Sequence, residues 1–274
     1  MSPISAPAWK RGSGTKVLDG GRRGLYSGKT KHSGIMSLAK LYEAHRTGQG
    51  DDRLVKIVLV SRRIIWLWAP KNAGGSVSRA LMNVHGADAV VCDLALEALW
   101  TLNPDMRSFR VMAIKRNPYT RAVSCWLNKI MFETESNEGY FKRYAGLRQG
   151  MSFPEFAAWL NSPEGGDRKA NPHWQSQHLQ LGRADELLSF EDLPESARAL
   201  GIKPSQLPHK NRHTEMTEAA AMESRPLVDW YDAAAYRDIT QRYARDLEFL
   251  GYSFPGDPPA EVPEPALEPA HPGP

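Results

Sequence analysis

An apolar run, a glycine-rich loop and a helical pattern follow one another in this chain and constrain its fold more than any other feature. The run covers residues 64–69 and the loop Pro-Lys-Asn-Ala-Gly-Gly-Ser covers 70–76. A helix is expected from Ser76, because apolar residues then recur at helical spacing: Val77, Ala80, Leu81 and Val84. Glycines let the backbone approach an anion, and the N–H groups at a helix start point at it. With the charge of Lys71, the loop predicts a phosphate or sulfate site.

Nucleotide triphosphatases carry a related loop, in which the lysine follows the glycines in the pattern G-x-x-x-x-G-K-[ST]. Here Lys71 precedes Gly74 and Gly75, which argues against that class. A near-match, Gly-Leu-Tyr-Ser-Gly-Lys-Thr at residues 24–30, is one residue short and follows no apolar run. We therefore assign no nucleotide triphosphate site to it.

A second segment also has an apolar, strand-like run followed by a helical pattern. The apolar run at residues 109–114 predicts a buried strand, and Pro118 suits the first turn of the helix that follows. That helix has one apolar stripe, made of Ala122, Val123, Trp126, Leu127, Ile130 and Met131. Arg116 at the strand end and Ser124 two turns into the helix can both face an anion above the strand. Arg116 would offer its planar guanidinium and Ser124 its hydroxyl.

The two segments together resemble sulfotransferases that use 3′-phosphoadenosine 5′-phosphosulfate (PAPS). Residues 70–77 are similar to their 5′-phosphosulfate loop, P-K-x-[AG]-[GS]-[ST]-[ST]. Residues 115–129 resemble their 3′-phosphate segment, R-[DN]-P-x-x-R-x-x-S-x-[WY]. The resemblance spans roughly residues 54–254 and points to soluble, bacterial-style members of the carbohydrate-type, sulfotransferase family 2-like group.

Weaker similarities follow in the second half of the chain. Residues 171–177, Asn-Pro-His-Trp-Gln-Ser-Gln, resemble an H-W-x-x-Q segment of carbohydrate-type members, and residues 190–193, 208–212 and 243–252 fit the same group. One position departs from the family pattern. Gly75 stands where the family more often has Ser or Thr, which removes one hydroxyl, although Ser76 follows directly.

The resemblance implies sulfuryl transfer from PAPS to an acceptor hydroxyl, that of a glycan in the group it points to. It implies that Lys71 lies on the 5′-phosphosulfate and stabilises the departing oxygen, and that Arg116 and Ser124 hold the 3′-phosphate. The residues implied for the 5′ site are Pro70, Lys71, Asn72, Ala73, Gly74, Gly75, Ser76 and Val77. No metal is expected, because lysine and backbone amides supply the positive charge.

The transfer also needs a general base near the acceptor hydroxyl. His173, in the H-W-x-x-Q-like segment, is the first candidate. A histidine that packs or contacts the substrate is the alternative at that position. His85 at the end of the first helix, and Asp93 and Glu97 in the stretch after it, compete for the role.

Two other functions fit part of the pattern. A catalytically silent module that binds PAPS, or the product 3′-phosphoadenosine 5′-phosphate (PAP), would keep Arg116 and Ser124 without a working base. The presence of Lys71 argues against it. A nucleotide kinase with the same kind of sheet would need the late lysine that this loop lacks.

Strand-like runs that alternate with helical patterns predict the fold class. With runs at residues 56–61, 63–69 and 109–114, we expect a single α/β domain with a mainly parallel central sheet, flanking helices and ligands at the strands' carboxyl ends. The stretch up to residue 108 is expected to be irregular. Helical patterns also occur near residues 35–42, after a capping box at 152–155, and in a long final helix that stops at Gly251.

The chain ends differ from this body in composition. Residues 1–31 contain seven Lys or Arg and one Asp, and residues 255–274 contain four acidic residues and eight prolines. We expect both ends to be disordered, with the sulfotransferase domain at residues 32–254. The body is nearly neutral, so the high isoelectric point belongs to the leader and indicates no nucleic-acid partner. The leader could still contact an anionic membrane or polysaccharide.

Location in the cell is predicted from what the sequence lacks. It has no apolar run of 18 residues and no signal-peptide core. Cys92 and Cys125 have no metal or redox spacing and are expected to be reduced packing residues. These features favour a cytoplasmic protein without a transmembrane segment.

Overall fold

The computed structural model describes residues 54–86, 88–92, 94–131, 138–167, 171–208 and 225–259. All of them belong to one compact unit, Ile35–Pro274. The expected basic leader, the expected helix at 35–42 and residues 260–274 of the expected tail lie outside the described residues. The domain limits at 32 and 254 therefore stay a prediction.

The central sheet has five strands in the order β3-β1-β2-β4-β5. They are β1 (Lys56–Leu59), β2 (Ile64–Leu67), β3 (Ala89–Cys92), β4 (Arg110–Lys115) and β5 (Glu186–Ser189). The strands β2, β4 and β5 are parallel, whereas β1 is antiparallel to both β2 and β3.

The sheet is thus mixed, and the expectation of a mainly parallel sheet was wrong for its β1–β3 side. The turn between β1 and β2 is too short for a parallel crossover, so these strands form a hairpin. The strand β3 lies in the stretch that was expected to be irregular. It is an edge strand of four residues with Val91 36% exposed, so its apolar pattern is short and only half buried.

The helices are α2 (Gly74–His85), α3 (Leu96–Leu102), α4 (Pro118–Trp126), α5 (Glu138–Arg143), α6 (Phe153–Leu160), α7 (Gln177–Leu181), α8 (Leu193–Ala199), α10 (Ala233–Arg242) and α11 (Ala244–Leu250). A π-helical turn, Leu127–Met131, extends α4, and 3₁₀ turns cover Pro104–Ser108, Pro204–Gln206 and Leu227–Trp230. The first helix begins two residues earlier than expected. The expected long final helix is interrupted at Tyr243 and ends, as predicted, before a left-handed Gly251.

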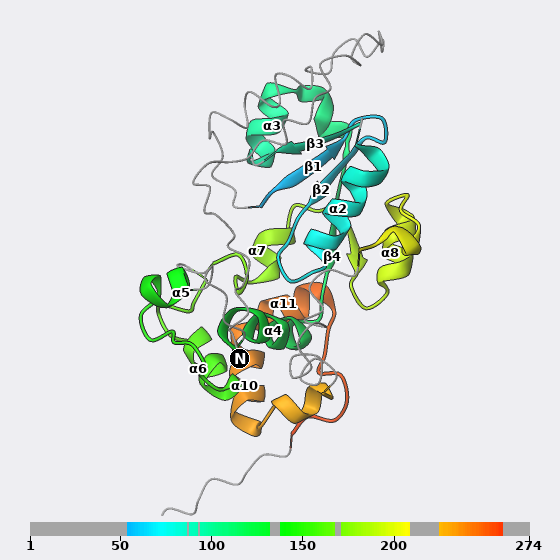
Figure 1. The fold of residues 1–274 in the computed structure, drawn as a ribbon. Coiled ribbons are helices and arrows are strands. Elements are labelled where there is room, and N and C mark those ends of the chain that lie inside the picture. The colour runs from blue at the N-terminus through cyan, green and yellow to red at the C-terminus, as the bar shows by residue number, and fades with distance from the viewer. Residues whose placement is uncertain are drawn as a thin grey trace, which may run out of the picture. The chain divides into compact units, whose positions relative to one another are not determined.

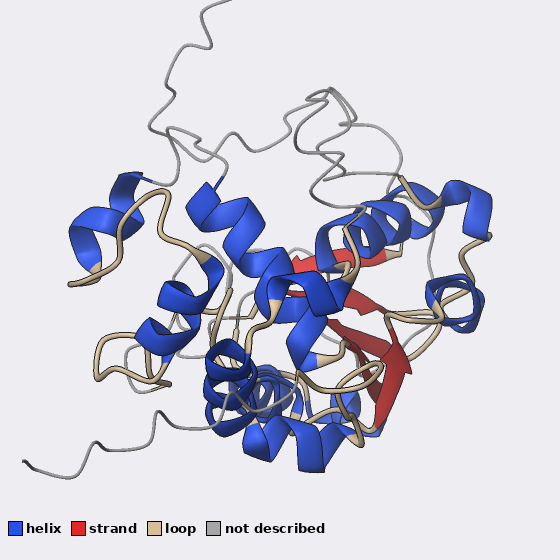
Figure 2. Ribbon diagram, turned by 90° about the horizontal axis from the view of Figure 1, so that it is seen from below, coloured by secondary structure: helices blue, strands red, loops and turns tan. Residues whose placement is uncertain are grey.

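Helices cover both faces of the sheet (Figures 1 and 2). Successive side chains of a strand point to opposite faces. In β2, Ile64 and Trp66 therefore pack in the cluster that holds α2 and α8, while Ile65 and Leu67 pack in the cluster that holds α3. This explains why the sequence of β2 is a continuous apolar run. Side chains of the sheet contribute to two of the three apolar clusters, one on each face.

The third cluster is a helical and aromatic core built by α4, α6 and α10, which lie together in Figure 1. Trp126, Trp159 and Trp174 are buried there. The predicted capping box opens α6: the Glu155 carboxylate accepts from Ser152 N at 2.7 Å, and the Ser152 hydroxyl accepts from Glu155 N at 3.4 Å. This core supports the segments that approach the carboxyl ends of the strands.

The topology places the two predicted anion segments side by side. The parallel strands β2 and β4 are neighbours, with Leu67 opposite Ala113. Their carboxyl ends therefore meet at one edge of the sheet, where α2 and α4 begin. An open α/β sheet binds its ligands at such an edge.

Candidate functional site

The loop between β2 and α2 turns through two residues with left-handed backbone. Lys71 has φ 70° and Ala73 has φ 57°, values that residues other than glycine adopt rarely and at some cost. The helix α2 begins at Gly74, and no side chain caps its first turn. The N–H groups of that turn are therefore available to an anion in front of the helix.

The two glycines of the loop differ in what surrounds them. A Cβ on Gly74 would lie 2.1 Å from Trp68 Cδ1 and 2.7 Å from the Ala69 carbonyl oxygen, so packing requires glycine there. A Cβ on Gly75 would meet only Trp68 Cζ2, at 3.8 Å. The position at which the sequence departs from the family pattern therefore has room for a side chain.

Lys71 is a partly exposed cation at the start of this turn. No described hydrogen bond or ion pair involves its ammonium group. Burial, together with the nearby Arg116, lowers the pKa of Lys71 from its usual 10.5 to about 8. At neutral pH the site thus holds a lysine that is charged and lacks a partner acceptor among the described residues.

Arg116 follows β4, where the second segment was predicted to bind an anion. Its Nη1 donates to the Lys71 carbonyl at 2.8 Å and its Nε donates to the Thr120 hydroxyl at 3.1 Å. Its guanidinium lies over the Phe190 ring, with 4.0 Å from Cζ to the centroid. These contacts fix the guanidinium beside the first loop, and sequence reasoning did not foresee Thr120 or Phe190.

The start of α4 follows the prediction closely. Asn117 caps the helix by accepting from Tyr119 N at 3.0 Å, and Pro118 occupies the first turn. Ser124, two turns further, is partly exposed.

A cavity of about 1180 Å³ brings most of the predicted site residues together. Its lining includes Pro70, Lys71, Ala73, Gly74, Gly75, Ser76, Arg116, Ser124 and His173. Asn72 and Val77 do not line it, because their side chains are buried behind the loop. Among the described residues the lining contains no aspartate or glutamate. With Lys71 and Arg116 among them, the described lining residues are electropositive.

His173 borders the cavity from the segment before α7. Its Nδ1 is buried and has no hydrogen-bond partner among the described residues, and its ring is T-shaped against Tyr140, with 6.2 Å between centroids. Burial, and then the charges of Lys129 and Lys71, lower the pKa of His173 to about 3. The imidazole is therefore neutral at neutral pH, and its low pKa makes it a weak base while no anion is bound beside it.

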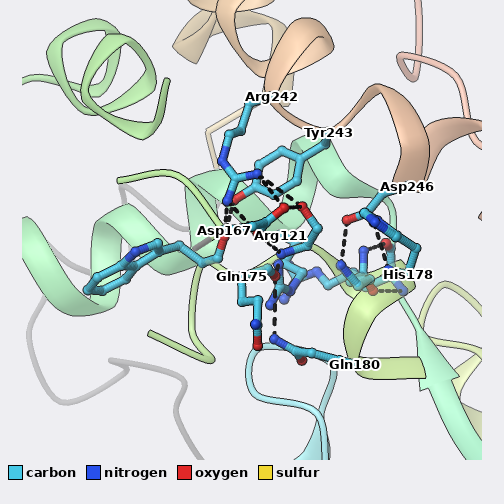
Figure 3. Close-up of polar contacts among 12 residues, drawn as sticks. Arg121, Asp167, Gln175, His178, Gln180, Arg242, Tyr243 and Asp246 are labelled. Carbon is cyan, nitrogen blue, oxygen red and sulfur yellow. Dashed lines mark hydrogen bonds and ion pairs between the residues drawn. The ribbon is translucent and has the colours of Figure 1, made fainter. Parts of the chain in front are cut away.

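Four side chains hold the backbone of this segment in place (Figure 3). Arg121 donates to the carbonyls of Gln175 at 2.9 Å and Pro172 at 3.1 Å, and Gln180 also donates to Pro172 O at 2.7 Å. The Trp174 carbonyl accepts from two residues at the junction of α10 and α11, Tyr243 at 2.8 Å and Arg242 at 3.3 Å.

Arg242 is in turn paired with the carboxylate of Asp167 at 2.7 Å. Sequence reasoning missed these positioning residues. The second arginine of the R-N-P-x-x-R pattern, Arg121, was the one available signal. The polar residues of the final helices gave no sign that they turn inward.

The competing bases lie elsewhere or are not described. His85 is at the far end of α2, about 16 Å along the helix from Gly74, and its Nε2 is 3.3 Å from the Leu200 carbonyl oxygen. Glu97 is exposed on α3 and paired with Arg183 at 3.0 Å. Asp93 lies outside the described residues. Of the named candidates that are described, His173 alone lines the cavity.

Searches among curated proteins and among solved structures each gave no match. No described helix has the length and apolar character that a membrane crossing requires. A family model described as the Sulfotransferase family matches residues 60–253, which is more than half of the chain and contains both anion segments and His173. The chain belongs to the sulfotransferase family.

Proposed function

We propose that this protein transfers the sulfuryl group of PAPS to a hydroxyl group of a carbohydrate. The observation that carries the proposal is Lys71, a charged and half-buried lysine without a described partner at the uncapped start of α2. A buried charge is costly unless it is compensated. An anionic ligand would supply that compensation.

The donor's two anionic groups fit two places in the cavity. The first turn of α2 and Lys71 would hold the 5′-phosphosulfate, while Arg116 and the Ser124 hydroxyl would hold the 3′-phosphate. A cavity of about 1180 Å³ exceeds the volume range typical of small-molecule sites, which leaves space for an acceptor beside the donor. A ligand with one phosphate would use half of these contacts.

The side chains supply charge stabilisation and proton transfer around the group that PAPS contributes. Lys71 and the N–H groups of α2 would stabilise the negative charge that develops on the departing oxygen. His173 borders the same cavity. The negative charge of PAPS beside Lys71 would offset the cations that lower the pKa of His173, so we assign its imidazole the proton of the acceptor hydroxyl.

The lining of the cavity supports a carbohydrate acceptor. It includes the aromatic rings of Tyr140 and Trp230 and the amides of Asn128 and Asn171. Apolar ring faces with a few polar groups are a common way to orient a small polar ligand. Sugars present both apolar ring faces and hydroxyls, so this lining suits them better than it suits a purely apolar acceptor.

The test is incubation of the whole protein with sulfur-labelled PAPS and fractionated glycans, followed by mass identification of the product. We expect a sulfated glycan with the wild type and with Lys142→Met, an exposed lysine on α5 that pairs with Glu138. We expect little product with Lys71→Met. Tight PAP binding without product from any fraction would favour a silent binding module, and preference for ATP over PAP would favour a kinase.

A further inference from the structure

One buried amide connects the two anion segments. Gln177, at the start of α7, is fully buried. Its Oε1 accepts from Asn72 Nδ2 at 2.7 Å and from the Arg116 backbone N–H at 3.0 Å, and its Nε2 donates to the Arg116 carbonyl at 2.7 Å. The same side chain thus contacts the loop that contains Lys71 and the strand end that contains Arg116.

The amide is itself anchored from a third part of the chain. The carboxylate of Asp246 on α11 is fully buried and accepts from Gln177 N at 2.6 Å. It also accepts from His178 N and His178 Nδ1, both at 2.7 Å (Figure 3). Gln177 is therefore fixed independently of the two segments that it joins.

Asn72 transmits this anchoring to the loop. Its Nδ2 donates to Gln177 and also to the Ile114 carbonyl on β4, at 2.7 Å. Its side chain is buried away from the cavity, so it contributes no contact to a ligand there. The neighbouring Lys71 occupies a strained left-handed conformation, which persists only where surrounding contacts hold it.

We propose that Gln177 is a positioning residue that sets the separation between the 5′ and 3′ anion sites, so that one donor binds both at once. This inference rests on the proposed function, because it requires a ligand with two charged ends. A ligand that spans two sites gains affinity only when the sites are held at the separation of its ends. Loosening the separation removes that gain and leaves each single site nearly intact.

The test compares ligands that carry both phosphates or one. Calorimetry would measure binding of PAP, adenosine 5′-phosphate and adenosine 3′-phosphate to wild type and Gln177→Met, a substitution of similar length that removes all three hydrogen bonds. We expect PAP to bind about tenfold or more weakly, as loss of buried hydrogen bonds suggests, and each monophosphate to change by less than about threefold.

A matched control lies one turn along the same helix. Gln180 is also buried and bonds to the Pro172 carbonyl, but to neither anion segment. Gln180→Met should keep the ratio of PAP affinity to monophosphate affinity. Asn72→Ala should lower that ratio as Gln177→Met does, and the double variant should lose less than the sum, because the two side chains share one bond. If Gln177→Met does not fold, Asn72→Ala carries the test.

The outcomes separate this inference from the proposed function. If wild type binds PAP no better than the monophosphates, the proposed donor is wrong. If wild type prefers PAP, but Gln177→Met and Asn72→Ala weaken all three ligands by one common factor, the positioning role is wrong.

Discussion

The cavity and the buried polar residues that hold the backbone around His173 treat buried charge in opposite ways. We call these residues the clamp: Arg121, Asp167, Gln180, Arg242, Tyr243 and Asp246. In the clamp, Arg242 pairs with Asp167 and the Asp246 carboxylate accepts three hydrogen bonds. In the cavity, Lys71 has no described ion pair, and no described carboxylate lines the wall. Compensated charge holds backbone in place, whereas uncompensated charge of one sign is what a site for an anion requires.

His173 lies between the two regions and shows what each contributes. The clamp fixes the backbone on both sides of it through the carbonyls of Pro172 and Trp174. Burial, followed by the charges of Lys129, Lys71 and Arg121, keeps its pKa near 3. The clamp therefore decides where the imidazole is, and burial among nearby cations decides its charge.

The largest expected effect comes from breaking the clamp. Arg242→Ala leaves the partly buried Asp167 carboxylate with only its hydrogen bonds from Ser176, so we expect a loss of about 3 kcal/mol of unfolding free energy, the lower end of the range for a buried pair. Arg198→Ala is the control, because its pair with Glu195 is exposed and worth at most about 1 kcal/mol. Chemical denaturation measures both. Similar losses in the two variants would show that the clamp is no stronger than a surface pair.

Lys71→Met should have the opposite pattern, with a loss of turnover and no loss of stability. Removing one preorganised charge-stabilising group lowers turnover by about 10²–10³, or roughly 3–4 kcal/mol. The melting temperature should stay or rise, because an uncompensated cation is removed. Turnover at saturating PAPS and thermal melting measure the two effects. If Lys71→Met kept wild-type turnover, or melted many degrees lower than the wild type, Lys71 would not be a residue that serves activity at no gain in stability.

The pH dependence of donor binding tests whether the charge of Lys71 serves the ligand. Lys71 is charged below its lowered pKa of about 8, so PAP affinity should be flat from pH 6 to 7.5 and fall by up to about tenfold per unit above 8. Lys71→Met should abolish this fall. Calorimetric titrations at several pH values provide the measurement. An affinity that stays constant to pH 9.5 would show that Lys71 does not contact the donor.

The stability of the protein without ligand should change in the other direction. The folded pKa of Lys71 lies below the usual 10.5, so the unfolded chain binds more protons between about pH 8 and 10.5. The contribution of Lys71 to stability therefore rises with pH across this window, while donor affinity falls. The difference between wild type and Lys71→Met in denaturation at pH 7 and 10 isolates it.

The smallest effect is expected at the glycines of the loop. Gly75→Ser has room, gains about 0.5 kcal/mol of helix propensity and adds a hydroxyl at the start of α2, so PAP should bind about two- to fivefold more tightly. Gly74→Ser is the control and should destabilise the fold, because its Cβ would overlap the Trp68 ring. If Gly75→Ser lowers PAP affinity, the contact between the ligand and the backbone of the loop requires glycine at this position.

Local patterns predicted the parts of the fold that local physics controls. The strands at residues 56–59 and 64–67, the Pro118 helix start, the capping box at Ser152 and the helix end at Gly251 were all read from short sequence signals. The mixed sheet was not, since β3 is a short edge strand whose pairing partner is about thirty residues away. The break at Tyr243 was missed for a similar reason: its hydroxyl bonds to Trp174 O, a contact that helical periodicity does not report.

The sequence by itself determined which residues can bind anions and that each set follows a strand and begins a helix. Loop chemistry, helix starts and apolar runs depend on residues that are neighbours in the chain, so they can be predicted from the sequence. Only the tertiary structure decided that Lys71, Arg116 and His173 share one cavity and that Gln177 joins the first two segments. Those relations depend on strand order and on hydrogen bonds between residues that are far apart in the sequence. Gln177 is 61 positions from Arg116 and 105 positions from Asn72, and a single sequence has no local signal for such contacts.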